Sequence, residues 1–108
     1  MAVLLGAFDA VGVEVPGLFG VEEVDIDHFL VSDADAASAA AARMGATEVR
    51  RRDVLVAATK GRAGITDVLR RLADHGVSID MVYATFGGEL VVGIEGDDID
   101  RAIAAVAG

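Results

Sequence analysis

The chain has 108 residues, of which 54% are apolar and 5% aromatic, and its formal net charge is −9. This charge disfavours nucleic acids and anionic membranes as partners, because proteins bind both mainly through Lys and Arg. The chain holds no cysteine, which excludes disulfides, thiolate nucleophiles and cysteine-bound metals and is typical of a cytoplasmic protein.

The first half of the chain, residues 1–52, is predicted to form a helix, two strands and a second helix. The second helix is rich in Ala, the residue with the highest helix propensity, and Asp33 is placed to cap it. Pro16 predicts an irregularity in the first strand, because proline cannot donate to a strand ladder. A further strand is expected from Thr47 and leads directly into the second half. The expected ranges are helix 2–11, strands 13–20 and 23–31, and helix 34–44.

The second half, residues 53–108, is predicted to begin with a strand over 53–59, whose β-branched and apolar residues indicate burial on both faces. Two glycines within 60–64 then predict a turn. An apolar stripe with helical spacing follows, and Gly76 is placed to end that amphipathic helix. The residues of the stripe are Ile65, Val68, Leu69 and Leu72.

The remainder of this half is predicted to be a hairpin followed by a helix. Alternating apolar residues predict a strand over 77–85, and the glycine pair at 87–88 turns the chain into a second strand over 89–95. The aspartate pair at 97–98 supplies an N-cap for the last helix. In the first of these strands, one face is predicted to hold Val77, Ile79, Met81 and Tyr83.

The two halves repeat one another imperfectly at an offset of about 64 residues, which is typical of two small units of the same fold. Met1 aligns with Ile65, so the segment 46–64 has no counterpart in the first half, and we expect the opening strand of that half to be missing. The aligned pairs are Leu4 and Val68, Leu5 and Leu69, Phe8 and Leu72, Gly12 and Gly76, Val13 and Val77, Val15 and Ile79, Phe19 and Tyr83, then, at an offset of 65, Asp33 and Asp98, Ala37 and Ala102.

The element order predicts an α+β fold of the ferredoxin-like class, in which a βαββαβ unit forms an antiparallel sheet with both helices on one face. We expect a tandem repeat with units at 1–52 and 53–108 that share one sheet, the second unit lacking its closing strand. Missing strands leave sheet edges unpaired, and such edges commonly pair with another chain. A homodimer formed through sheet edges or helices is therefore expected.

Residues 63–84, together with Asp98 and Ala102, resemble the ACT domain family, in particular proteins with tandem ACT domains. The shared features are the amphipathic helix, the Gly-Val-Ser-Ile sequence at 76–79 and the Tyr-Ala pair at 83–84. The resemblance implies a non-enzymatic, allosteric regulatory module that binds a small effector, usually an amino acid, between two units. In the family, the turn before the first helix contacts the effector on one side, and the start of the next strand of the neighbouring unit contacts it on the other.

The turn at 60–65, where the resemblance places the effector, departs from the family pattern. Lys60 stands where the family has Asp, Arg62 where it has Pro, and Ala63 where it has Gly. Two added positive charges and one lost carboxylate favour an anion over a zwitterionic amino acid, and the backbone N–H groups of a helix N-terminus are ready partners for a carboxylate. The candidate ligand-binding residues are Lys60, Gly61, Arg62, Ala63, Gly64 and Ile65, with Ser78 and Glu14 at the two strand starts.

Two other functions stay open from the sequence. One is a structural assembly module without a ligand, which the altered turn favours. The other is a small ferredoxin-like enzyme, whose site would have to use Asp25, Asp27 and His28. No metal site, cofactor or catalytic residue is otherwise indicated, because no Ser-His-Asp set, nucleotide-binding glycine loop or zinc-ligand spacing is found. The arginine run at 50–52 is expected to pair with carboxylates.

Overall fold

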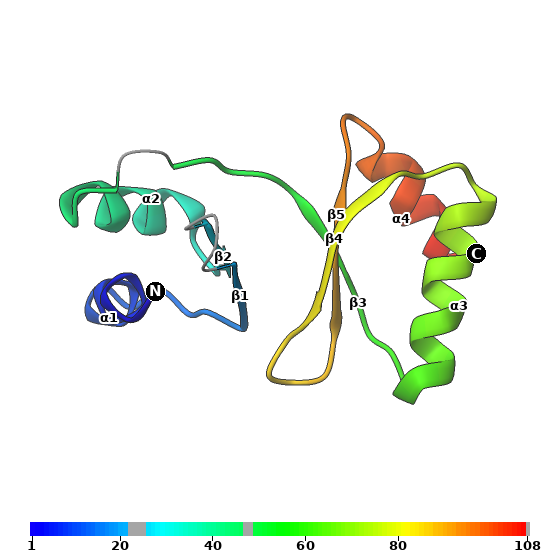
Figure 1. The fold of residues 1–108 in the computed structure, drawn as a ribbon, viewed down its shortest axis with the longest axis horizontal. Coiled ribbons are helices and arrows are strands. Elements are labelled where there is room, and N and C mark those ends of the chain that lie inside the picture. Colours follow the sequence, from blue (N-terminus) through cyan, green and yellow to red (C-terminus); the bar gives the residue numbers. More distant parts are fainter. Residues whose placement is uncertain (22–25, 47–48, 108) are drawn as a thin grey trace. The chain divides into compact units, whose positions relative to one another are not determined.

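The computed structural model describes residues 1–21, 26–46 and 49–107 and divides into two compact units (Figure 1). The units are Met1–Arg51 and Arg52–Gly108, so the division lies one residue before the boundary expected from the repeat. The expectation of one shared sheet is wrong, because each unit has an antiparallel sheet of its own, with two strands in the first unit and three in the second. The described residues thus form an α+β fold with four helices.

The first unit consists of two helices and a β-hairpin in the predicted order. Its elements are α1 (Ala2–Ala10), β1 (Gly17–Val21), β2 (Ile26–Leu30) and α2 (Ala34–Arg43). β1 pairs antiparallel with β2 and begins later than expected, because the chain bends at Pro16. The strand expected from Thr47 is not formed over residues 49–53, which are irregular; Thr47 itself and the first residues of the strand expected over 23–31 lie outside the described residues.

A small core lies between the two helices and β2 of the first unit. Phe8 of α1 is 4% exposed, and its ring meets that of Phe29 edge to face at 5.0 Å between centroids. Asp33 caps α2 as predicted, because its Oδ1 accepts a hydrogen bond from the N–H of Ala36 at 3.1 Å. The buried residues of this core are Phe8, Val13, Ala37, Ala40 and Ala41.

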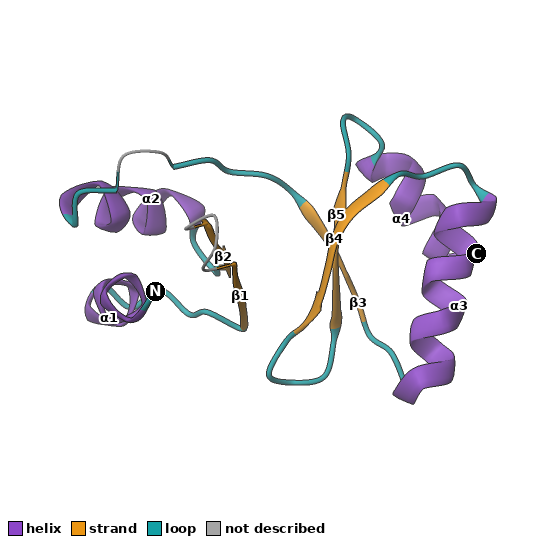
Figure 2. Cartoon of the chain, in the orientation of Figure 1, coloured by secondary structure: helices purple, strands orange, loops and turns teal. Residues whose placement is uncertain are grey.

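The second unit is a three-stranded sheet covered by two helices. Its elements are β3 (Val54–Ala57), α3 (Gly61–Asp74), β4 (Ile79–Ala84), β5 (Leu90–Ile94) and α4 (Ile99–Ala107). β3 and β4 each pair antiparallel with β5, so they run parallel to each other on either side of it. α3 and α4 lie on the same face of this sheet (Figure 2). All five residues of the central strand β5 are buried.

Three helices end in the same way, at a glycine with positive φ. Gly12, Gly45 and Gly76 have φ values of 77°, 84° and 68°. After each helix, the N–H of the glycine and the next N–H donate to the carbonyls three and five residues earlier, which is the Schellman motif. Gly76 ends α3 as predicted. Gly12 is its equivalent in the repeat, and the residues that follow the two glycines, Val13 and Val77, are both buried.

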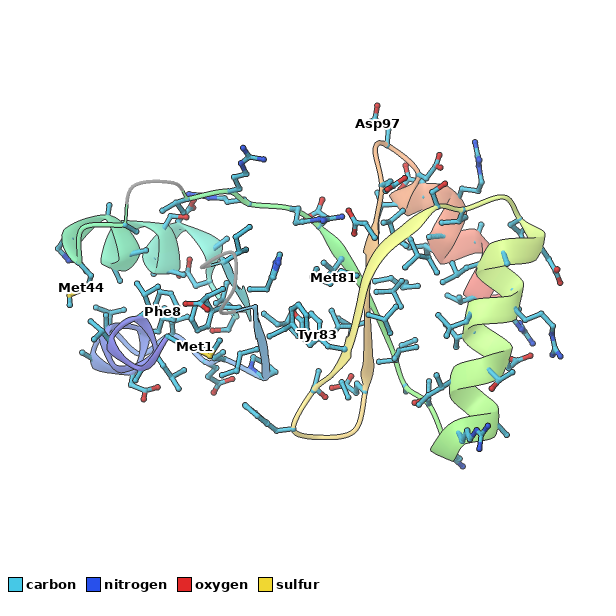
Figure 3. All side chains as sticks on the ribbon, in the orientation of Figure 1. Met1, Phe8, Met44, Met81, Tyr83 and Asp97 are labelled. Carbon is cyan, nitrogen blue, oxygen red and sulfur yellow. The ribbon has the colours of Figure 1, made fainter. Side chains whose placement is uncertain are left out.

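An irregularity in β4 changes which face its side chains occupy. Ile79 lies opposite Ile94 and Met81 lies opposite Gly93, so β4 advances two residues where β5 advances one. An extra residue of this kind moves every later side chain to the other face of the sheet. Ile79 packs against the core beneath the helices, whereas Met81 and Tyr83 point away from α3 and α4 (Figure 3). The prediction that the apolar residues of this strand share one face is therefore wrong.

Candidate functional site

The segment 60–65 forms the start of α3 rather than the separate turn expected over 60–64. Lys60 holds the N-cap position in an extended conformation, with φ −113° and ψ 97°, and the helix begins at Gly61. Gly61 has a φ of 64°, a conformation that favours glycine. Arg62 and Ala63 are exposed, whereas Ile65 packs against the core of the second unit. The glycines therefore shape the first turn of a helix that starts four residues earlier than its apolar stripe indicates.

The N-terminus of α3 carries positive charge and lacks a side-chain cap. Lys60 makes no side-chain cap hydrogen bond, and the first turn contains no acidic residue. Lys60 and Arg62 form no ion pair with the described residues, whereas Arg70 and Arg71 of the same helix bind Asp67 at 2.9 and 3.0 Å. The first N–H groups of a helix have no intrahelical partner, and the helix dipole adds positive potential there. This end of α3 is suited to an anion.

Ser78 does not lie near the start of α3 in the second unit, and Glu14 belongs to the other unit. The carbonyl of Ser78 accepts a hydrogen bond from the N–H of Glu95 at 3.0 Å, where β4 begins and β5 ends. α3 starts after the opposite end of the same sheet, which is set by β3. Glu14 belongs to the first unit, where its N–H donates to the hydroxyl of Ser32 at 2.9 Å. The second unit alone therefore supplies a candidate site from 60–65 without Ser78.

An open hollow of about 610 Å³, which the sequence did not indicate, lies at the end of the sheet where β5 ends. Arg52 joins β4 and β5 at this end of the sheet. Its Nη1 binds Asp80 Oδ2 at 2.9 Å, and its Nη2 donates to the carbonyl of Ile94 at 2.9 Å. The expected pairing with carboxylates is confirmed for Arg51 and Arg52 of the arginine run, since Arg51 also binds Asp35 within the first unit. The carboxylates that line the hollow are Asp53, Asp80, Glu95, Asp97 and Asp100.

Tyr83 gives the chain a measurable response to alkaline pH. Partial burial raises the pKa of its hydroxyl above the ordinary value of 10.0. As pH rises, the tyrosine of the unfolded chain therefore loses its proton before that of the folded chain. The contribution of Tyr83 to the free energy of unfolding is complete below about pH 10 and is lost as pH rises through the pKa of the folded state. Tyr83 is the only tyrosine, so tyrosinate absorbance during an alkaline titration reports on it alone. We expect a midpoint above 10 in the folded protein; a midpoint at or below 10 would contradict the burial.

The residues of the alternative enzyme site do not form a cluster within the described residues. Asp25 lies outside those residues, and Asp27 binds the amino group of Met1 at 3.4 Å. His28 lies on β2 with its ring 5.8 Å from that of Phe19. In the described ranges, no group of three or more His, Asp or Glu side chains is placed to hold a metal ion. No helix in the same ranges is long and apolar enough to cross a membrane.

Comparison with known proteins adds no further constraint. The chain matches no family model, and no curated protein and no solved structure is significantly similar to it. The function is therefore inferred from the residues and the geometry described above.

Proposed function

We propose that the chain is a non-enzymatic regulatory module that binds a small anionic effector at the N-terminus of α3. The observation that carries this proposal is the pair of exposed cations, Lys60 and Arg62, beside a helix start that has no side-chain cap and no acidic residue. An anion bound there accepts hydrogen bonds from the N–H groups of the first turn. A negative charge at a helix N-terminus is favoured by about 0.3–1 kcal/mol when exposed and by up to about 2 kcal/mol when partly buried.

The topology of the second unit supports an ACT-like origin for this module. Its elements follow the βαββα part of a ferredoxin-like unit, and the strand order β3-β5-β4 places one antiparallel strand between two parallel ones. The first unit repeats the αββα part of the same order. We therefore propose a tandem ACT-like arrangement in which the second unit carries the helix start that binds the effector.

The charges around the site favour a dicarboxylate or a phosphate over a free amino acid. The ammonium group of an amino acid needs a carboxylate partner, and the first acidic residue of α3 is Asp67. Arg70 and Arg71 both hold that carboxylate. A simple anion needs no carboxylate partner and can form charge-assisted hydrogen bonds with both Lys60 and Arg62.

Regulation by this module follows from linkage. The effector shifts the protein toward the conformation or assembly that it binds more tightly, by no more than its difference in affinity for the two states. A partner protein that binds the favoured state then responds to the concentration of the effector.

A thermal-shift screen with inorganic phosphate, small dicarboxylates and the common amino acids tests this proposal. A probe at about 100 times its dissociation constant adds about 2.7 kcal/mol to the stability of the folded state. We expect at least one anionic probe to raise Tm, and the combined Lys60→Ala and Arg62→Ala substitutions to abolish that rise. Arg70→Ala is the control, because it removes an arginine from the same helix away from the site. A Tm that no probe raises, or a rise that survives the double substitution, would contradict the proposal.

A structural assembly module without a ligand is the second candidate function. It is favoured by the apolar surface that α1 exposes, since Val3 is 64% exposed on that helix. A chain that forms one stable assembly and responds to none of the probes would fit this function instead.

A further inference from the structure

The exposed face of α1 is uncharged along most of its length. It consists of Ala2, Val3, Gly6, Asp9 and Ala10, all of which are exposed, and Asp9 is the only charged residue of the helix. Soluble helices usually carry charged or polar residues on the face that meets water. The composition of this face indicates that it is covered in the assembled protein.

The internal repeat provides a direct comparison, because α3 is the equivalent helix of the second unit. At the offset of 64 residues, Val3, Gly6 and Ala10 align with Asp67, Arg70 and Asp74. Asp67 and Arg70 form an ion pair at 2.9 Å on the outer face of α3. The same position in the fold is therefore charged and solvated in one unit and apolar in the other, so the difference belongs to α1 and not to the fold.

We propose that this face of α1 binds the same face of α1 in a second copy of the chain, with the two helices antiparallel. The charges of α1 are self-complementary in that orientation only. Asp9 lies in the last turn, where its own helix dipole disfavours a carboxylate, and the first turn contains no acidic residue. An antiparallel partner places each Asp9 near the positive N-terminal end of the other helix. Two chains that each carry a net charge of −9 repel each other overall, which favours a contact through a face with few charges.

Gly6 marks the centre of the proposed contact. It is the middle residue of Ala2–Ala10, and a Cβ added to it would meet no atom within 4 Å. The two helices can therefore approach closely where they cross. A helix of this length is only about 14 Å long, so a specific contact of about 800 Å² per partner needs neighbouring apolar residues as well. Other large apolar residues that are exposed at the ends of the two helices of this unit are Met1, Val11 and Met44, at 42%, 44% and 50%.

A cysteine introduced at Gly6 tests the proposal directly, because the native chain has no thiol. Gly6→Cys places the two thiols next to each other across the two-fold axis, and Arg70→Cys places a thiol at the equivalent exposed position of α3. Thiols held together in a complex react at effective concentrations on the order of millimolar, so at about 10 μM protein we expect Gly6→Cys to oxidise to a covalent dimer on the order of a hundredfold faster than Arg70→Cys. Light scattering on the native chain and on Val3→Asp gives a second readout: a dimer is expected for the first and a monomer for the second.

The outcomes separate this proposal from other arrangements. Equal oxidation rates for Gly6→Cys and Arg70→Cys would overturn it, whether the chain is a monomer or a dimer formed through another surface. A Val3→Asp variant that is folded by circular dichroism and keeps the mass of a dimer would overturn it as well. The proposal does not depend on an effector at the N-terminus of α3, since neither readout involves a ligand.

Discussion

Leu72→Ala is expected to lower the free energy of unfolding of the second unit by about 2–5 kcal/mol. Leu72 is fully buried, and it packs in the cluster formed by α3, α4 and the sheet. Its truncation removes buried methyl groups and leaves a cavity that a close-packed core cannot fill. A unit of this size buries a smaller fraction of its surface than a larger domain does, so a loss of this magnitude is a large part of its total stability.

Phe8→Ala is the matched substitution in the first unit, because Phe8 is the repeat equivalent of Leu72 and is also buried. Urea unfolding followed by circular dichroism reports on both units, whereas tyrosine fluorescence reports on the second unit through Tyr83 alone. We expect Leu72→Ala to shift the tyrosine transition to lower urea by more than Phe8→Ala does, because only Leu72 lies in the core of the unit that holds Tyr83. Ile103→Ala is the surface control, since Ile103 is 50% exposed and its truncation should cost much less. A tyrosine transition that Leu72→Ala leaves unchanged would contradict the described core.

The features predicted correctly from the sequence are those set by local chemistry. The N-cap of α2 depends on the side chain of Asp33 and the N–H of Ala36, which are three residues apart. The end of α3 depends on a left-handed residue, and Gly76 adopts that conformation without strain from a Cβ. Both interactions are complete within a few residues of chain, so the sequence alone contains them.

The faces of the strands could not be predicted, because they depend on pairing between distant segments. The shift at Asp80 is visible only as the change of register against β5. Asp80 aligns in the repeat with Pro16, where the chain bends before β1. Only the proline indicates an irregularity from the sequence, since aspartate is compatible with a regular edge strand. The two separate sheets were missed for the same reason, because no local pattern fixes which strands pair.

The segment 60–65 stays a predicted binding site, and its helical form differs from the turn that the sequence indicated. The residues 60–65 are contiguous in sequence, so any fold keeps them together, and their charges were apparent before the structure. Two glycines predicted a turn there, yet the helix begins at Gly61 because neither glycine stops the chain from entering it. The bridge from Arg52 to Asp80 and Ile94 joins residues up to 42 positions apart, and no sequence pattern indicates those partners.

Gly93→Ala is expected to lower the free energy of unfolding by about 1–3 kcal/mol, because it overfills the centre of the second sheet. A Cβ at Gly93 would lie 2.6 Å from Asp80 Oδ1 and 3.1 Å from the Cβ of Met81. The carboxylate of Asp80 cannot move away freely, since Arg52 holds it at 2.9 Å, and the Cβ of Met81 is fixed by the backbone of β4. The glycine is therefore required by the irregularity opposite it rather than by its own backbone conformation.

A double-substitution cycle with Asp80→Ala isolates this steric cause. Removing the Asp80 carboxylate removes the closest atom, so Gly93→Ala should cost less in the Asp80→Ala background than in the native chain. Part of the cost should persist, because Met81 still approaches the new methyl group. Gly87→Ala is the control: its Cβ would meet only the Thr85 hydroxyl at 3.8 Å, an ordinary contact, and its effect should stay within about 0.5 kcal/mol. If Gly93→Ala is as neutral as Gly87→Ala in urea unfolding, β4 and β5 do not pack as closely at the irregularity as the register requires.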